Sequence, residues 1–276
     1  MDSREKDFIS ALKFGIFELK DYVDFNKVVE HTEKVKIYLN ALNALLTSSD
    51  IPATINALWK ENPRIFSVLG ILLAVRDSNE KFVLLPDGSN VIMSEYFNSP
   101  KNVIDYLSNT GLLSFFHNQK VNNLVDYVFG IEVGLDTHAR KNRGGGLMQT
   151  YVSDILASKN VTFQCQVPIK NLPNDLKKSF GKKRKVFDFV FKGNNKTWIV
   201  EVNFYGSTGS KVSETTSSYI NLQELITRVP GYDFMWITDG KAWENDSASL
   251  SNALENINHF YNLKSFEKII DKILEE

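Results

Sequence analysis

Two stretches of alternating apolar and polar residues stand out in the C-terminal half of the chain. In the first, Phe187, Phe189 and Phe191 alternate with other side chains, and the second, residues 198–205, repeats the same period. Alternation with a period of two is typical of β-strands. Because residues 193–195 (Gly-Asn-Asn) tolerate a positive φ, the two strands are predicted to form a hairpin.

Helical periodicity dominates the remainder of the chain. A short hairpin is predicted over residues 81–93, with Asp87-Gly88 at its turn, and a third core strand over residues 232–238. Two helices are predicted to begin at prolines, a favourable first helical position. The predicted helices cover residues 4–20, 25–46, 52–60, 63–75, 99–110, 121–131, 147–160, 213–227, 249–261 and 265–275.

The order of these elements predicts an α/β fold, with a mixed sheet that has helices on its faces. We expect a mainly helical N-terminal region over residues 1–120 and a sheet-containing core over residues 121–276. No apolar run approaches the roughly 18 residues that span a bilayer, and the first residues contain no apolar signal segment. The sequence therefore predicts a cytoplasmic protein without a membrane partner.

Two acidic residues of the predicted hairpin are candidates for a metal site. Alternation places Glu201 and Asn203 on one side of the second strand, and Asp188 on the neighbouring strand can reach the same point. Buried carboxylates need a compensating cation or hydrogen bonds, and a pair of them suits Mg²⁺. Lys211, downstream, is a candidate for orienting water or neutralising a phosphate. The alternative is an ordinary hairpin whose acids are solvated. The spacing of the two acids, taken alone, favours this alternative over a metal site.

The charge of the chain is concentrated around these acids. Residues 139–211 contain 14 Lys and Arg against 4 Asp and Glu, whereas acidic residues are in excess on both sides. A positive block of this kind is expected of a groove for a polyanion, and a solvated charge run is the alternative. Basic residues followed by three glycines at 140–146 predict a loop that opens a helix towards an anion. The residues expected to contact nucleic acid are Arg140, Lys141, Asn142, Arg143, Lys182, Lys183, Arg184 and Lys185.

Other residue types add little to this candidate chemistry. The single Cys165 excludes an intrachain disulfide and a cysteine zinc cluster, and the four histidines have no ligand-like spacing. Asp239 is a possible third acid, although the chemistry of its Asp-Gly turn explains it equally well.

Four blocks in this order resemble the type II restriction endonucleases of the DpnII/MboI group. They are GIEVGLDTHARKNRGG (130–145), FDFVFK (187–192), VEVNFYGSTGSK (200–211) and FMWITDGKAW (234–243). The resemblance implies a restriction-endonuclease-like fold of the PD-(D/E)xK superfamily and Mg²⁺-dependent cleavage of double-stranded DNA at GATC, on the 5′ side of the guanine.

Within this resemblance, Asp188 is the first acid and Glu201-Val202-Asn203 takes the place of the E-x-K element. Asn203 stands where Lys is usual, which makes Lys211 the candidate substitute. Many relatives in the superfamily add a helix Glu to the site. Gln149 and Glu132 are the residues to consider here, and the sequence assigns the role to neither.

The palindromic site predicts a symmetric dimer in which each protomer cuts one strand. Two other interpretations remain open. The first is a structure-specific or repair nuclease on the same core. The second is a DNA-binding relative that has lost catalysis, which Asn203 in place of Lys would suggest. The sequence gives no role to the N-terminal helical region.

Overall fold

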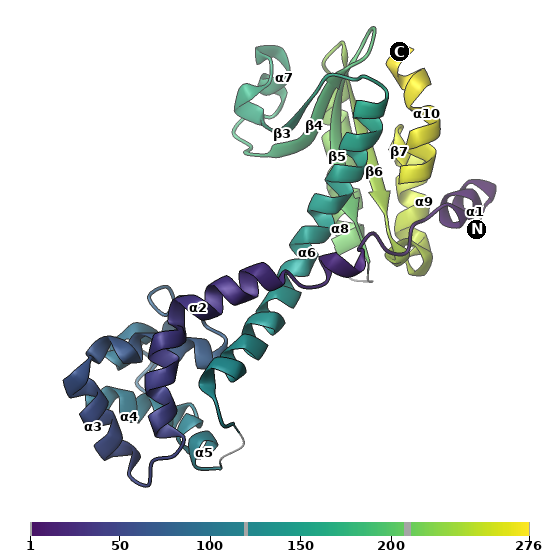
Figure 1. Ribbon diagram of the computed structural model, residues 1–276. Helices are drawn as coiled ribbons and strands as arrows, with labels where there is room; N and C mark the ends of the chain where they lie inside the picture. Colours follow the sequence, from purple (N-terminus) through teal and green to yellow (C-terminus); the bar gives the residue numbers. More distant parts are fainter. Residues whose placement is uncertain (1, 119–120, 207–210, 276) are drawn as a thin grey trace. The chain divides into compact units, whose positions relative to one another are not determined.

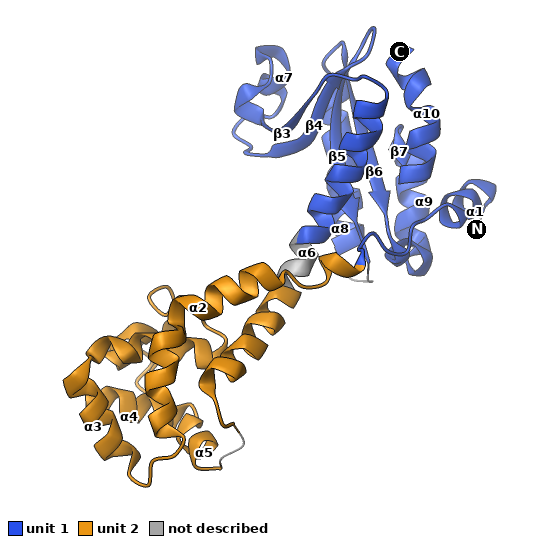
Figure 2. Ribbon diagram, viewed as in Figure 1, with its two compact units in different colours: residues 1–18, 141–276 blue, residues 19–140 orange. Residues whose placement is uncertain are grey.

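The computed structural model describes residues 2–118, 121–206 and 211–275, with the side chains of residues 138–142 excepted. The chain forms two compact units (Figure 2). Unit 1 comprises residues 1–18 and 141–276, and unit 2 comprises residues 19–140. The division falls inside helix α6 (Leu124–Ser158), so this helix contributes to both units. Assignment of residues 121–276 to one functional core stays a prediction.

Unit 1 is built on a five-stranded sheet in the order β3-β4-β5-β6-β7. The strands are β3 (Phe163–Pro168), β4 (Val186–Lys192), β5 (Thr197–Phe204), β6 (Tyr232–Asp239) and β7 (Phe260–Tyr261). The β3–β4 and β4–β5 pairs are antiparallel, whereas β5–β6 and β6–β7 are parallel. The predicted hairpin and the mixed sheet are therefore confirmed.

Helices cover both faces of this sheet, so the α/β fold class is confirmed (Figure 1). One face carries α1 (Ser3–Ser10), α7 (Asn174–Ser179), α8 (Lys211–Thr227) and α9 (Ser247–Asn256). The C-terminal part of α6 and α10 (Leu263–Glu275) pack on the other. Trp236 and Trp243 are fully buried in the first layer and belong to its core.

Unit 2 is mainly helical, as predicted, and has its own apolar core. Leu39, Phe66, Leu69, Val103 and Phe116 are among the side chains buried in that core. Its larger elements are α2 (Phe25–Leu42), α3 (Ile51–Glu61), the 3₁₀ helix η3 (Pro63–Leu73), α4 (Pro100–Asn109), α5 (Leu112–His117) and the hairpin of β1 (Phe82–Leu84) and β2 (Asn90–Ile92). Unit 2 also has the short 3₁₀ turns η1 (Leu19–Asp21), η2 (Asn43–Leu45) and η4 (Met93–Phe97), whereas η5 (Ile169–Asn171) and η6 (Lys241–Asn245) belong to unit 1.

The predicted loop over residues 140–146 was wrong, because α6 continues through the three glycines. Each glycine costs a helix only about 1 kcal/mol relative to Ala. Buried residues on both sides, Val128 before the glycines and Met148 and Val152 after them, stabilise one continuous helix. No helix therefore begins at Leu147, so the predicted helix N-terminus that would face an anion is not formed there.

Several helix boundaries also differ from the predictions. The first helix ends at Ser10 and does not reach residue 20. Helix α9 ends at Asn256, because Phe260 and Tyr261 pair with β6 as an edge strand. Strand β3 was not predicted. Of the helices in the described part of the chain, none combines the length and the apolar character needed to cross a membrane.

Candidate active site

The candidate site lies where the pairing of three strands is interrupted. The β3–β4 ladder keeps one register on both sides of Gln166, but Gln166 and Asp188 themselves do not pair. The β4–β5 ladder ends at the pair Phe189 and Val200. If both registers are continued, Gln166, Asp188 and Glu201 fall in one row across the sheet. The interruption leaves room for side chains to take the place of backbone hydrogen bonds.

The carboxylate of Asp188 is held by three donors. Its Oδ2 accepts the Val202 N–H at 2.8 Å, in place of a ladder bond. Its Oδ1 accepts the side-chain amides of Gln149 on α6 at 2.7 Å and of Gln166 on β3 at 3.1 Å. Burial raises the pKa of Asp188, and the Val202 hydrogen bond is the strongest influence that lowers it. These contacts fix the orientation of the carboxylate.

Gln166 reaches Asp188 from a strained backbone. Its φ is 51°, in the left-handed region that a residue with a side chain rarely adopts inside a strand. Such a conformation costs on the order of 1–3 kcal/mol and persists only where the surroundings enforce it. The strain coincides with the interruption of the β3–β4 ladder, and it occurs at a residue that contacts the first acid.

Glu201 is the most deeply buried acid of the site, with 4% of its surface exposed. Its Oε2 accepts from the Tyr219 hydroxyl at 2.6 Å and from Lys185 Nζ at 3.0 Å. Its Oε1 is buried and has no hydrogen-bond partner among the described residues. Burial raises the pKa of Glu201 to about 7, Lys185 opposes this rise, and the charge of Asp188 adds to it.

The free oxygen of Glu201 is the observation that fits a metal ion. A buried acceptor without a donor costs roughly 1–3 kcal/mol, which a cation at that oxygen would relieve. One lone pair of Asp188 Oδ2 is also unused by the donors described above. A divalent cation with oxygen ligands takes one or two carboxylates and completes its shell with water and phosphate. Asp188 and Glu201 provide such a set.

Asp239 does not extend this set of acids. It is fully buried, and it accepts the backbone N–H groups of Lys13, Gly240 and Leu263. Of the two interpretations that the sequence left open, these contacts favour the structural role over that of a third acid. Within the ranges that the structure describes, no cluster of three or more His, Cys, Asp or Glu side chains is able to hold a metal ion.

The lysine beside the acids is not the one that the sequence favoured. Lys185, predicted as a DNA contact, pairs with Glu201, and its ammonium lies 5.3 Å from the centre of the Tyr219 ring. Lys211 is exposed at the first position of α8 and makes no hydrogen bond or ion pair with either acid in the described part of the chain. Asn203 Oδ1 accepts the Trp236 indole N–H at 2.9 Å.

The other predicted DNA contacts occupy the surface or lie outside the described residues. Lys182, Lys183 and Arg184 are exposed just before β4. Lys183 and Lys185 line a cavity of about 190 Å³, together with Ser218 and Asn221 of α8. Arg143 is half-buried on α6. The side chains of Arg140, Lys141 and Asn142 are outside the described residues.

The sequence did not assign the neutral donors of the site. Gln149 had been considered only as the occupant of a position where relatives use Glu, and the structure brings it to Asp188. Glu132, the other candidate, contacts Arg76 and His31 in unit 2. Tyr219 lies on the buried side of α8 with Val212 and Thr216, a spacing that the helical period of the sequence contains. Nothing in the sequence signals the positive φ of Gln166.

Comparison with known proteins gives the family. The family model described as DpnII restriction endonuclease matches residues 4–272. The type II restriction enzyme MboI of Moraxella bovis is 38% identical over 270 residues, which cover 98% of this chain and 96% of the relative. The type II restriction enzyme DpnII of Streptococcus pneumoniae is 31% identical over 284 residues, with 97% of each chain covered. The chain therefore belongs to the DpnII restriction endonuclease family and is a type II site-specific deoxyribonuclease.

Proposed function

We propose that this enzyme cleaves double-stranded DNA at GATC, on the 5′ side of the guanine, by Mg²⁺-dependent hydrolysis of the phosphodiester bond. The choice of site rests on the resemblance of the four sequence blocks to the DpnII/MboI group. The choice of mechanism rests on one observation, the buried Oε1 of Glu201 that has no donor among the described residues. That oxygen lies on the acid opposite Asp188, in a family whose members cut DNA.

We assign a single cation to Asp188 and Glu201. Restriction endonucleases depend in general on a divalent metal ion, and Mg²⁺ suits two carboxylates. Four side chains, those of Gln149, Gln166, Lys185 and Tyr219, already use Asp188 Oδ1 and Glu201 Oε2. The oxygens left for coordination suffice for one ion more readily than for two. When bound, the cation stabilises charge on the phosphate and lowers the pKa of a bound water.

The roles of the nearby polar residues follow from their distances. Lys185 favours the ionised form of Glu201 against the burial that raises its pKa to about 7, and we propose that its ammonium faces the phosphate at the acids. The predicted roles of Lys211 and Asn203, positioning water and phosphate, stay proposals. Tyr219 keeps its proton, because burial and the Glu201 charge raise its pKa, and it orients Glu201 by donating to it.

The DNA is proposed to run along the basic residues before β4 and the basic segment of α6, residues 140–143. Exposed Lys182, Lys183 and Arg184 suit phosphate contacts, which supply affinity without sequence information. A palindromic site is matched by a symmetric homodimer, with one active site for each strand.

A digest of plasmid DNA with Mg²⁺, followed by sequencing of the ends, tests this function. We expect every end to begin with GATC. Cleavage of branched or damaged DNA without a common site would favour a repair nuclease, and no cleavage with any divalent metal would favour an inactive binding relative.

Methylated DNA provides the matched control for that digest. A methyl group on adenine N6 brings bulk into the major groove and removes a donor that a recognition amide would accept from, a loss worth about 1–3 kcal/mol per base pair. We expect plasmid that is fully methylated at adenine N6 of GATC to resist the enzyme. Equal cleavage of methylated and unmethylated plasmid in one tube would contradict the proposed recognition.

A further inference from the structure

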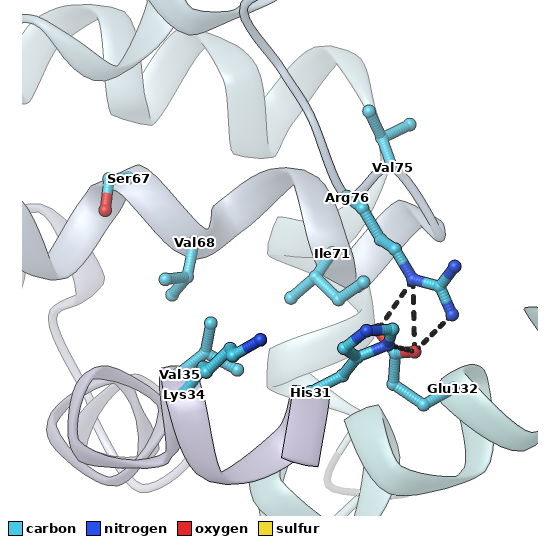
Figure 3. A pocket seen from close by; sticks show the side chains of 9 residues that line it. All are labelled: His31, Lys34, Val35, Ser67, Val68, Ile71, Val75, Arg76 and Glu132. Atoms are coloured by element: carbon cyan, nitrogen blue, oxygen red, sulfur yellow. Dashed lines mark hydrogen bonds and ion pairs between the residues drawn. The ribbon is translucent and has the colours of Figure 1, made fainter. Parts of the chain in front are cut away.

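Unit 2 contains a cavity of about 310 Å³ that has no assigned role. Its apolar lining comprises Val35 of α2, Val68 and Ile71 of η3, and Val75, which lies next to Arg76 (Figure 3). Its polar side combines His31 and Lys34 of α2 with Arg76 and Glu132. Cavities of this volume lie at the lower end of the range that holds small molecules, roughly 300–1,000 Å³.

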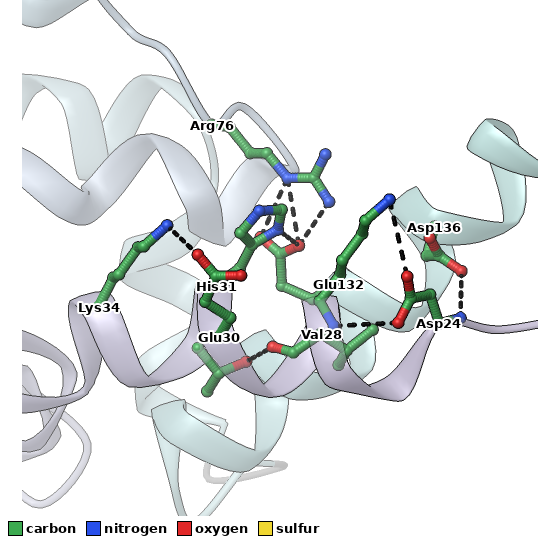
Figure 4. Close-up of polar contacts among 10 residues, drawn as sticks. Asp24, Val28, Glu30, His31, Lys34, Arg76, Glu132 and Asp136 are labelled. Carbon is green, nitrogen blue, oxygen red and sulfur yellow. Dashed lines mark hydrogen bonds and ion pairs between the residues drawn. The ribbon is translucent and has the colours of Figure 1, made fainter.

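A buried carboxylate organises the polar side. Glu132 is 3% exposed at its side chain, and it accepts Arg76 Nε at 3.1 Å and Nη2 at 2.5 Å. His31 Nδ1 lies 3.1 Å from the same Oε2 (Figure 4). Burial alone would raise the pKa of Glu132, but Arg76 and His31 together lower it below its usual value. The carboxylate is therefore ionised, and the proton of the contact sits on His31 Nδ1.

The contacts with Glu132 leave donors for a further partner. Arg76 uses Nε and Nη2, and none of the described residues takes its Nη1. Arg76 and His31 are 45% and 33% exposed at their side chains, so both are accessible. Lys34 also lines the cavity, and its partner Glu30 is an exposed residue of the same helix, a weak pairing.

The chain segment that carries Arg76 is held in an unusual backbone conformation. Ala74 has a φ of 61°, in the left-handed region, and ends η3. Val75 N donates to Gly70 O at 3.0 Å, and a Cβ added to Gly70 would meet Ser78 Oγ. This close approach explains the glycine. It also holds the loop backbone against η3, and the ion pair with buried Glu132 orients the side chain of Arg76.

We propose that this cavity binds the phosphate group of a nucleotide unit, with the attached sugar or base on the apolar side. The charges of Lys34 and Arg76 outweigh the single charge of Glu132, whose oxygens point to Arg76 and His31, so the site favours an anion. The planar guanidinium of Arg76 matches phosphate oxygens. The phosphate has two sources with the same chemistry. One source is the DNA backbone, and this version of the proposal rests on the proposed DNA cleavage. The other source is a free nucleotide, and this version is independent of that function.

The experiment uses the full chain in EDTA, so that the result is independent of the metal site and of cleavage. Deoxyadenosine monophosphate is titrated by calorimetry, and a fluorescent duplex is titrated by anisotropy. Arg76→Gln and Lys34→Gln remove cavity charges, and Arg64→Gln removes a charge from an exposed residue of η3 that does not line the cavity. We expect both cavity variants to weaken one of the two probes by at least about fivefold, as for a lost charge-assisted hydrogen bond. The control should leave both affinities unchanged.

The two probes distinguish the sources. An effect on the mononucleotide assigns the cavity to a free nucleotide, and an effect on the duplex alone, with a salt slope lower by about one, assigns it to the DNA backbone. Arg76→Gln can lower the thermal midpoint, because Glu132 loses its partner. In that case the affinities of Lys34→Gln decide whether the cavity binds phosphate, since this variant leaves the Arg76–Glu132 ion pair intact. The proposal is overturned if both probes bind the cavity variants and the Arg64→Gln control alike, or if no mononucleotide binds at millimolar concentration and duplex affinity is unaffected.

Discussion

The carboxylate of Glu201 combines near-complete burial with an oxygen that no described residue serves. A buried oxygen without a donor is unfavourable in the metal-free protein. The same burial raises the pKa of the Glu201 carboxyl group to about 7. Lys185 and Tyr219 keep the other oxygen in place. Metal-free stability is thus given up at the point where the proposed cation would restore it, a pattern common at catalytic sites.

This cost predicts how stability depends on pH. Between the ordinary Glu value of about 4.3 and the folded value, the native state keeps a proton that the unfolded state releases. The contribution of Glu201 to stability therefore falls as the pH rises through this window. Without metal, Glu201→Gln should melt at a higher temperature than the wild type at pH 8, with a smaller gain at pH 5.

Thermal melts in EDTA check this prediction, and exposed Glu214 on the nearby α8 provides the control. Glu214→Gln should change neither melt by more than surface substitutions do, about 0.5 kcal/mol. A Glu201→Gln protein that is less stable than the wild type at pH 8 would contradict the account of its burial.

A second prediction about single residues concerns Lys185. Lys185→Met keeps much of the side-chain length but removes the ammonium at 3.0 Å from Glu201. We expect the single-turnover cleavage rate to fall by about 100-fold or more, as for the loss of one preorganised donor, with duplex affinity in Ca²⁺ nearly unchanged. Lys182→Met, in the same basic segment, should weaken binding and leave the rate of bound DNA intact.

The comparison with Lys211 separates the two lysines. If Lys211→Ala is inactive and Lys185→Met cuts normally, the role proposed here for Lys185 belongs to Lys211.

The positive φ of Gln166 in strand β3 leads to a testable prediction. In an ordinary strand position Gly is less stable than Ala by roughly 0.5–1 kcal/mol. At a φ of 51° the order should reverse, because Gly adopts this region without strain. We expect Gln166→Gly to be more stable than Gln166→Ala. The same pair of substitutions at Gln164, which pairs regularly with Val190, should show the usual order.

Denaturant unfolding of the four variants measures both differences. The same order at the two positions would mean that the backbone at Gln166 is not strained.

At the level of elements, the sequence predicted what depends on local patterns. The hairpin of β4 and β5 has uninterrupted alternation and turn residues at 193–195, and strand β6 is a compact apolar run. Strand β3, FQCQVP, was missed because its polar residues are mostly exposed and its partner lies about twenty residues along the chain. The glycines of α6 looked like a loop because their helix is stabilised by packing on both sides, which propensity does not include.

For the site, too, local patterns predicted the residues that lie on neighbouring strands but not those that the fold brings from distant elements. Asp188 and Glu201 follow from alternation, since strands fix which residues face each other. Gln149, Gln166 and Tyr219 come from α6, β3 and α8, and only the fold brings them to the acids. Lys185 was identified as basic but not as a partner of Glu201, because a charge run alone does not show which member turns inward.

On the scale of the whole molecule, the family assignment covers residues 4–272, which include both units. Unit 1 holds the two acids and their donors, and unit 2 holds the cavity around Glu132. The relatives match this chain over nearly their full length, so unit 2 is part of the enzyme and not an addition peculiar to this chain.

The single-turnover cleavage rate of a GATC duplex by Glu201→Gln in Mg²⁺ tests the proposed metal-binding role of Glu201 most directly. The substitution keeps the shape of the side chain and removes the charge that a cation needs. We expect a rate lower than that of the wild type by about 1,000-fold or more, in line with the loss of a metal ligand, while the duplex is still bound in Ca²⁺. Cleavage by Glu201→Gln at the wild-type rate would contradict the assignment of Glu201 to the active site.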